Sequence, residues 1–277
     1  MNRRLLAKQF ALGKSETSDE PGQEGKVYMT DAGAQASIGT ALVVSADAAA
    51  IAQVRETLQQ LAMSAQVCGE VSAALRLLAR YKFEAVLVDL GLGESAIKVF
   101  EQVRISSANR TAVTFAVSTN KEEASLAFKS GSNFVLQRPL NPDSLNQAFK
   151  AAYGLIVREK RRYFRYPVVV PAVIQPHGAS QLSGETVNVS EQGIALSLPV
   201  PLAVGVEGRV QFTLPDFSSP IAAGSRVCWS NQNGQAGLCF FSLAPGDQSE
   251  LQHWLARRLE QQLPESVAER FRQSSGR

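Results

Sequence analysis

Five basic side chains lie within one short stretch of the chain, residues 158–165. They are Arg158, Lys160, Arg161, Arg162 and Arg165, and Glu159 is the only acidic residue among them. The stretch therefore carries +4, more than the +3 of the whole 277-residue chain. A guanidinium is planar and forked, so it can hold a phosphate or the Hoogsteen edge of guanine through two hydrogen bonds. On composition alone, a run of solvated charge explains the stretch as well.

A second polar cluster follows in the run NVSEQG, residues 188–193. In an extended segment Asn188 and Ser190 point to the same side, because side chains alternate along a strand. Gly193 frees the backbone for a tight turn or a close approach. The two clusters together favour a binding site over a solvated charge run.

The pattern RxxxR at Arg161 and Arg165, followed by NxSxxG at 188–193, resembles the PilZ domain. This is a small β-barrel family whose members commonly bind the bacterial second messenger cyclic di-GMP. The run at 229–240, with Trp229 and Gly237, resembles the closing hairpin of the family. The likeness covers roughly residues 158–262.

The resemblance implies a role for each matching residue. Arg161 and Arg165 would clasp the guanine edges and phosphates of cyclic di-GMP, and Asn188 and Ser190 would hydrogen-bond a guanine or a phosphate. Gly193 would permit close approach. Two further basic residues are expected to assist, Lys160 and Arg162.

The first half of the chain predicts a different fold. From Thr40 a strand-then-helix pattern repeats five times, and apolar runs mark strands at 40–44, 83–90, 111–118 and 133–137. Continuous apolar strands separated by helices are typical of a doubly wound α/β fold with a parallel sheet. Ligands of such sheets bind beyond the carboxyl ends of the strands.

At those strand ends lie Asp89, Ser118 and Arg138, the last of these before a proline. Their placement resembles the phosphoacceptor, hydroxyl and basic positions of a two-component receiver domain. The family has an acidic pair after its first strand, where this chain has Ser45 and Ala46. Phosphoryl transfer needs Mg²⁺, which requires carboxylate oxygens. We therefore interpret Asp89 as a degenerate phosphoacceptor position and the domain as a pseudo-receiver that serves as an interaction module.

The pattern divides the chain into four parts. We predict a mobile tail at 1–37, a receiver-like domain at 38–157, a PilZ-like antiparallel β-barrel with a C-terminal helix at 158–263, and a tail at 264–277. Asn141 and Pro142 are predicted to begin the last helix of the receiver-like domain. No spacer separates this helix from the arginines. The C-terminal helix is predicted to begin with a capping box formed by Asp247 and Glu250.

Composition excludes several classes of protein. No apolar run approaches the ~20 residues of a membrane helix, and the N-terminus has no export signal, so the cytoplasm is expected. Three cysteines, Cys68, Cys228 and Cys239, show no metal-binding spacing and are predicted to be reduced. We expect no metal, no cofactor and no enzymatic activity, because no nucleophile, base and acid share a recognisable spacing.

These observations favour a cyclic di-GMP effector in which binding at the interdomain junction changes the domain arrangement and the binding of an unidentified protein partner. The alternative is a nucleotide-independent PilZ-type adaptor. A homodimer stays open. Nucleic-acid binding is disfavoured by the single compact basic patch and the lack of a recognition helix. A working phosphorelay receiver would require phosphorylation of Asp89.

Overall fold

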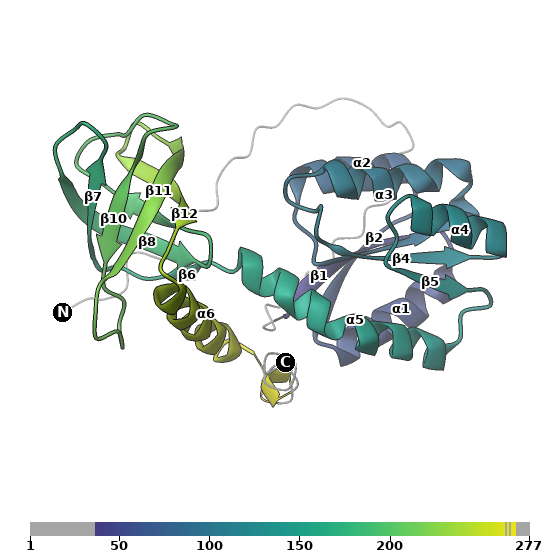
Figure 1. Ribbon diagram of the computed structural model, residues 1–277. Helices are drawn as coiled ribbons and strands as arrows, with labels where there is room; N and C mark the ends of the chain where they lie inside the picture. The colour runs from purple at the N-terminus through teal and green to yellow at the C-terminus, as the bar shows by residue number, and fades with distance from the viewer. Residues whose placement is uncertain (1–36, 264, 266, 270–277) are drawn as a thin grey trace, which may run out of the picture.

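The computed structural model describes residues 37–263, 265 and 267–269. The tail predicted at the N-terminus lies outside the described residues, apart from residue 37. The remainder forms two units joined by one long helix, as Figure 1 shows. No helix in the described part of the chain combines the length and apolar character that crossing a membrane requires.

The N-terminal unit is built on a five-stranded parallel sheet with strand order β2-β1-β3-β4-β5. Its strands are β1 (Gly39–Val44), β2 (Met63–Cys68), β3 (Ala85–Asp89), β4 (Val113–Ser118) and β5 (Phe134–Gln137). Its helices are α1 (Ala48–Gln60), α2 (Val71–Arg80), α3 (Ile97–Ile105), α4 (Lys121–Lys129) and α5 (Pro142–Tyr163), with 3-10 turns η1 (Leu90–Leu92) and η2 (Glu94–Ala96). The predicted doubly wound parallel fold is confirmed.

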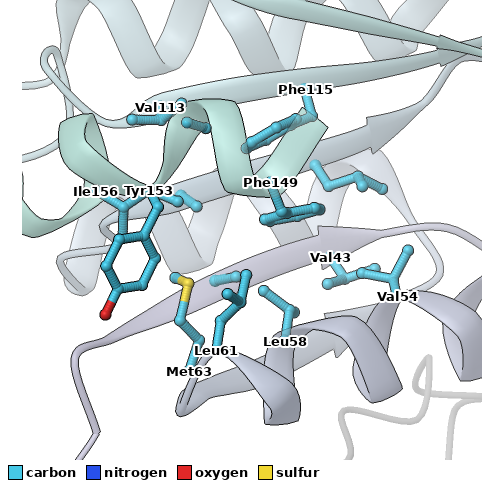
Figure 2. Packing of buried hydrophobic residues seen from close by; sticks show 14 of the residues in the cluster. Val43, Val54, Leu58, Leu61, Met63, Val113, Phe115, Phe149, Tyr153 and Ile156 are labelled. Atoms are coloured by element: carbon cyan, nitrogen blue, oxygen red, sulfur yellow. The ribbon is translucent and has the colours of Figure 1, made fainter. Parts of the chain in front are cut away.

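Helices cover both faces of this sheet, so its central strands are buried and apolar throughout. Residues of α1 and α5 form one core with the sheet, and residues of α2, α3 and α4 form the other. Figure 2 shows Phe149 of α5 beside Phe115 of β4, with the ring centroids 4.3 Å apart. The same core includes Leu58 and Val43 on the other side of Phe149.

Helix α5 links the two units without a break. Its N-cap is Asn141, whose side chain accepts a hydrogen bond from the Asp143 N–H, and Pro142 opens its first turn, as predicted. It then runs for 22 residues to Tyr163, past the expected boundary at 157/158. The helix therefore belongs to the receiver-like unit at one end and carries Arg161, the first arginine of RxxxR, at the other.

The C-terminal unit is an antiparallel β-barrel. Its strands are β6 (Tyr166–Pro167), β7 (Pro171–Pro176), β8 (Leu182–Ser190), β9 (Gly193–Ser197), β10 (Glu207–Phe212), β11 (Ile221–Ser230) and β12 (Gln235–Ser242). The order is β6-β8-β7-β10-β11-β12-β9, and β8 also pairs with β9, which closes the sheet. The predicted barrel is confirmed.

Helix α6 (Pro245–Glu260) lies against the barrel, as predicted (Figure 1). Trp254 is buried and meets the Tyr166 ring edge-on at 5.3 Å. The predicted capping box is wrong, because the helix begins at Pro245 and its N-cap, Ala244, has no side-chain hydrogen bond.

The end of the described chain returns to the receiver-like unit. Leu259 of α6 and Val267 both pack in the core formed with α1 and α5. Residues 265 and 267–269 are helical, and Val267 and Ala268 are buried. The segment predicted as a C-terminal tail is therefore packed in part, so the two units meet through α6 as well as through α5.

The cysteine prediction is wrong for two of the three residues. Cys228 of β11 and Cys239 of β12 form a disulfide with Cα atoms 6.2 Å apart. These strands are antiparallel neighbours with a register shift between Val227 and Trp229, so residues eleven apart in sequence meet across the ladder. Cys68 is free and buried.

Candidate functional site

The last two turns of α5 are held by the receiver-like unit. Glu159 is buried, and its carboxylate accepts hydrogen bonds from Lys82 Nζ at 2.6 Å and from Thr111 Oγ1 at 2.8 Å. The Lys82 ammonium also lies 4.5 Å from the centre of the Tyr163 ring, and the Tyr163 hydroxyl donates to the Ser107 carbonyl at 3.4 Å. These contacts orient the helix end that carries Arg161.

The short strand β6 brings the second arginine to the polar cluster. Tyr166 pairs with Val189, and Pro167 pairs with Asn188, and Arg165 directly precedes this strand. Tyr166 and Val189 both belong to the barrel core. Because side chains alternate along a strand, Asn188 occupies the outer face of the barrel, and Arg165 beside β6 is exposed.

Arg161 meets the same loop from the helix side. Its Nε lies 3.6 Å from Glu191 Oε1, in the turn between β8 and β9. Glu191 lies inside the NxSxxG motif at a variable position, so the motif spacing gives no signal for it. Burial raises the pKa of the Glu191 carboxyl, while the nearby guanidinium groups of Arg161, Arg158 and Arg162 act to lower it.

The guanidinium groups are incompletely satisfied. The Nε atoms of Arg161 and Arg162 are buried and have no hydrogen-bond partner among the described residues. A buried donor without a partner costs ~1–3 kcal/mol. Arg165 is exposed, and its one hydrogen bond here is a 3.4 Å contact from Nη1 to the Tyr163 carbonyl. An acceptor-rich anion would complete these donors.

The receiver-like unit has a second polar constellation at the carboxyl ends of its strands. The guanidinium of Arg138 bridges two carboxylates, donating to Asp47 Oδ2 at 2.7 Å and to Asp89 Oδ2 at 2.5 Å. Ser45 Oγ also donates to Asp89 Oδ2, at 2.8 Å, and the Gly91 N–H donates to Asp89 Oδ1, at 3.0 Å. Asp89 is therefore an acceptor with four lone-pair sites, three of which are engaged.

This arrangement places a cation where a receiver would need a metal. Hydrogen bonding to Arg138 lowers the pKa of Asp47, which also caps α1 by accepting from the Ala49 and Ala50 N–H groups. Among the described residues no group of three or more His, Cys, Asp or Glu could hold a metal ion. The guanidinium already neutralises both carboxylates, so the fit to Mg²⁺ is poor.

Comparison with protein families decides the identity of the barrel. The family model described as "PilZ domain" matches residues 159–257, which contain both motifs and every strand of the barrel. Residues 159–257 are a PilZ domain. Such domains bind ligands and are not themselves enzymes, and the family implies a cyclic di-GMP-binding effector.

Several solved structures are similar to parts of this chain. They include the receiver domain of a sensor histidine kinase from Pseudomonas aeruginosa (17% identity, 41% of this chain and 95% of that chain, TM-score 0.37). A second is the chemotaxis response regulator CheY4 of Vibrio cholerae (18% identity, 40% of this chain and 96% of that chain, TM-score 0.38). A third is the inhibitor of motility MotI/DgrA of Bacillus subtilis (24% identity, 35% of this chain and 50% of that chain, TM-score 0.32). Because these TM-scores are low, the receiver-like fold rests on the strand order, which CheY shares. Curated proteins give no match.

Two motif residues of the PilZ domain have structural duties. Ser190 is buried, and its hydroxyl donates to the Gly193 carbonyl at 3.1 Å, which closes the β8–β9 turn. A Cβ on Gly193 would lie 2.2 Å from the Leu238 carbonyl oxygen, so glycine is required here by the approach of β12. Both residues therefore shape the loop that carries Glu191 and Asn188.

The remaining predicted residues lie in the same region. Arg161 and Arg162 are in the last turn of α5, Lys160 precedes them, and all three are partly buried. Asn188 is half-buried on the outer face of β8. The structure thus brings Arg161 and the NxSxxG loop of the PilZ domain together at the junction of the two units.

Proposed function

We propose that this protein is a cyclic di-GMP effector that binds its ligand at the end of α5 and thereby changes how its two units are arranged. The observation that carries the proposal is the meeting of Arg161 with the NxSxxG loop, 3.6 Å from Glu191, at the tip of a helix anchored in the receiver-like unit. Arg161 and Arg165 would bind the guanine edges and phosphates, and Asn188 would hydrogen-bond the ligand from the barrel face.

Electrostatics support an anionic ligand. The basic residues of 158–165 exceed the net charge of the whole chain, and like charges so close together repel one another. Glu159 does not relieve this repulsion at the barrel, because it is buried against Lys82 and Thr111 of the receiver-like unit. A cyclic dinucleotide carries two negative charges and many acceptors, which would hydrogen-bond the Nε atoms of Arg161 and Arg162, neither of which makes a hydrogen bond within the described part of the chain.

The same helix turns supply the coupling. Arg161 lies between Glu159 and Tyr163, both of which contact the receiver-like unit through Lys82 or Ser107. A displacement of Arg161 towards a ligand therefore disturbs these contacts directly. Micromolar binding corresponds to about 8 kcal/mol, enough to shift an arrangement whose states differ by a few kcal/mol.

The receiver-like unit would act as the output surface. The oxygens of its Asp89 accept hydrogen bonds from Arg138, Ser45 and Gly91. We therefore propose that the receiver-like unit responds to the state of α5 and not to phosphorylation of Asp89. An unidentified protein partner would bind this unit, or two copies would associate through it. The expected compartment is the cytoplasm, where a second messenger acts.

Titration calorimetry with cyclic di-GMP tests the binding step. Wild type should bind with micromolar affinity, and Arg161→Ala and Arg165→Ala should each weaken binding strongly. The matched control is Arg209→Ala, since Arg209 is exposed on β10, across the barrel from β9. Absence of heat up to about 100 µM ligand, or equal effects of all three variants, would defeat the proposal.

Small-angle X-ray scattering tests the coupling step. Ligand should change the scattering profile of wild type, and Lys82→Ala should reduce this change when both proteins are saturated with ligand. Binding with an unchanged profile would leave a receptor without rearrangement and reject the coupling. Partner capture that is equally strong with and without the nucleotide would support the adaptor alternative.

A further inference from the structure

Trp229 lies on the same outer face of the barrel as the proposed ligand site. The register runs across four strands, because Asn188 of β8 pairs with Ala195 of β9, Ala195 pairs with Gly237 of β12, and Gly237 pairs with Trp229 of β11. Their chain neighbours Val189, Ile194 and Leu238 point into the barrel core. Side chains alternate along strands, so this row faces outward.

The indole lies across the neighbouring strand. A Cβ built on Gly237 would lie 2.0 Å from Nε1 of Trp229, so the ring covers the position where any other residue would place a side chain. The ring therefore extends from β11 over β12, towards Ala195 and the ligand loop. Trp229 is nevertheless 48% exposed, which leaves an aromatic surface open to solvent.

The spacing suits a second wall of the same site. Neighbouring strands are about 4.8 Å apart, so the strand under the indole lies about 10 Å from Asn188. Only Ala195 and Gly237, with at most a methyl group as side chain, lie between in the row. A cyclic dinucleotide presents two flat bases, and exposed aromatic rings stack bases.

We infer that Trp229 forms the far wall of the ligand site and stacks on a guanine base of the bound cyclic dinucleotide. The inference rests on the proposed function and adds a residue outside both motifs. The arginines supply charge and edge recognition at one side of the row, and the indole supplies a stacking surface at the other. Gly237 is required because it accommodates the ring.

Phe241 provides a matched control on the same strands. It is 58% exposed and lies over Gly224, four residues beyond Gly237 along β12. Four residues of strand span about 13 Å. Truncating Phe241 therefore removes a comparable exposed aromatic ring without touching the row that begins at Asn188.

Affinity for cyclic di-GMP tests the inference, measured by calorimetry on the full chain. Trp229→Ala should weaken binding about tenfold, Trp229→Phe should retain most of the affinity, and Phe241→Ala should bind like wild type. Circular dichroism of each variant establishes that it is folded. Equal affinity of wild type and Trp229→Ala would overturn the inference while leaving the proposed function intact, as would equal losses in Trp229→Ala and Phe241→Ala.

Fluorescence gives an independent readout that does not depend on the alanine variant. The chain has two tryptophans, and Trp254 is buried in the barrel core. Ligand should quench part of the wild-type emission, and this quenching should disappear in Trp229→Phe. Binding without quenching would overturn the inference. Absence of any ligand binding by wild type would instead overturn the proposed function, and the inference with it.

Discussion

Replacing Glu191 by Gln should tighten the binding of cyclic di-GMP. The Glu191 carboxylate lies 3.6 Å from Arg161 Nε, so it pairs with this arginine and competes with the ligand for it. Both side chains are largely buried, with 16% and 23% of their surfaces exposed for Glu191 and Arg161. The variant keeps the shape of the side chain and removes only its charge, so Arg161 is released for the phosphates.

The magnitude follows from the geometry of the pair. Two unit charges 3.6 Å apart attract by about 5 kcal/mol at an effective dielectric constant of 20. Solvent screening at this partly exposed pair reduces the attraction to a coupling of about 1 kcal/mol. The loss of hydration by the Glu191 carboxylate is a separate and larger cost, which is why its pKa is raised. Wild type gives up this coupling on binding, so Glu191→Gln should bind about fivefold more tightly.

The pH dependence has a defined sign. Burial raises the pKa of Glu191 above its ordinary 4.5, so acidification from neutral pH protonates the carboxyl and frees Arg161. Binding by wild type should therefore strengthen as the pH falls towards that pKa, and binding by Glu191→Gln should lack this component. Because the pKa of Glu191 is raised in the folded state, protonation of this carboxyl stabilises the fold. This stabilisation is complete below pH 4.5 and is lost as the pH rises through the folded-state pKa. Glu191→Gln should consequently resist urea better than wild type at neutral pH.

Calorimetry at constant ionic strength checks the affinity, with Glu185→Gln as the control. Glu185 is an exposed carboxylate on β8, so its variant makes the same change in net charge without touching Arg161. Affinity unchanged or weakened in Glu191→Gln would refute the competition between carboxylate and ligand. Equal tightening in both variants would assign the effect to net charge.

Three further outcomes test the rest of the structure. Glu159→Ala should lower the free energy of unfolding by about 2 kcal/mol, measured in urea, because it leaves the Lys82 ammonium beside the helix without its carboxylate. An unchanged urea midpoint would show that this ion pair does not stabilise the interface. Acetyl phosphate should leave Asp89 unmodified by mass spectrometry, since its oxygens are held by internal donors, and a phosphorylated peptide would reject the pseudo-receiver interpretation. Gly193→Ala should lower the melting temperature of the barrel strongly, because its Cβ would lie 2.2 Å from a carbonyl oxygen of β12. The control Gly246→Ala on α6 meets open space and should be neutral or slightly stabilising. Similar melting temperatures of the two variants would contradict the close approach at Gly193.

Some features could be read from the sequence because they depend on residues near one another in the chain. Buried parallel strands leave continuous apolar runs, and the helix starting at Pro142 has its cap and proline in adjacent positions. The strand β2 left no such run, because this edge strand, MSAQVC, mixes polar and apolar residues. The motif spacing around Arg161 and Asn188 likewise identified the PilZ domain.

Other features depend on which surfaces meet after folding, and no local pattern records them. The pairing of Arg161 with Glu191 arises because α5 continues to Tyr163 and ends beside the β8–β9 turn. The disulfide between Cys228 and Cys239 and the position of Trp229 over Gly237 depend on the register of β11 and β12. The sequence by itself determined the two folds and the motif residues, because periodicity and spacing are local. Only the tertiary structure decided which partner each charge and ring obtains, because those contacts join residues that are distant along the chain.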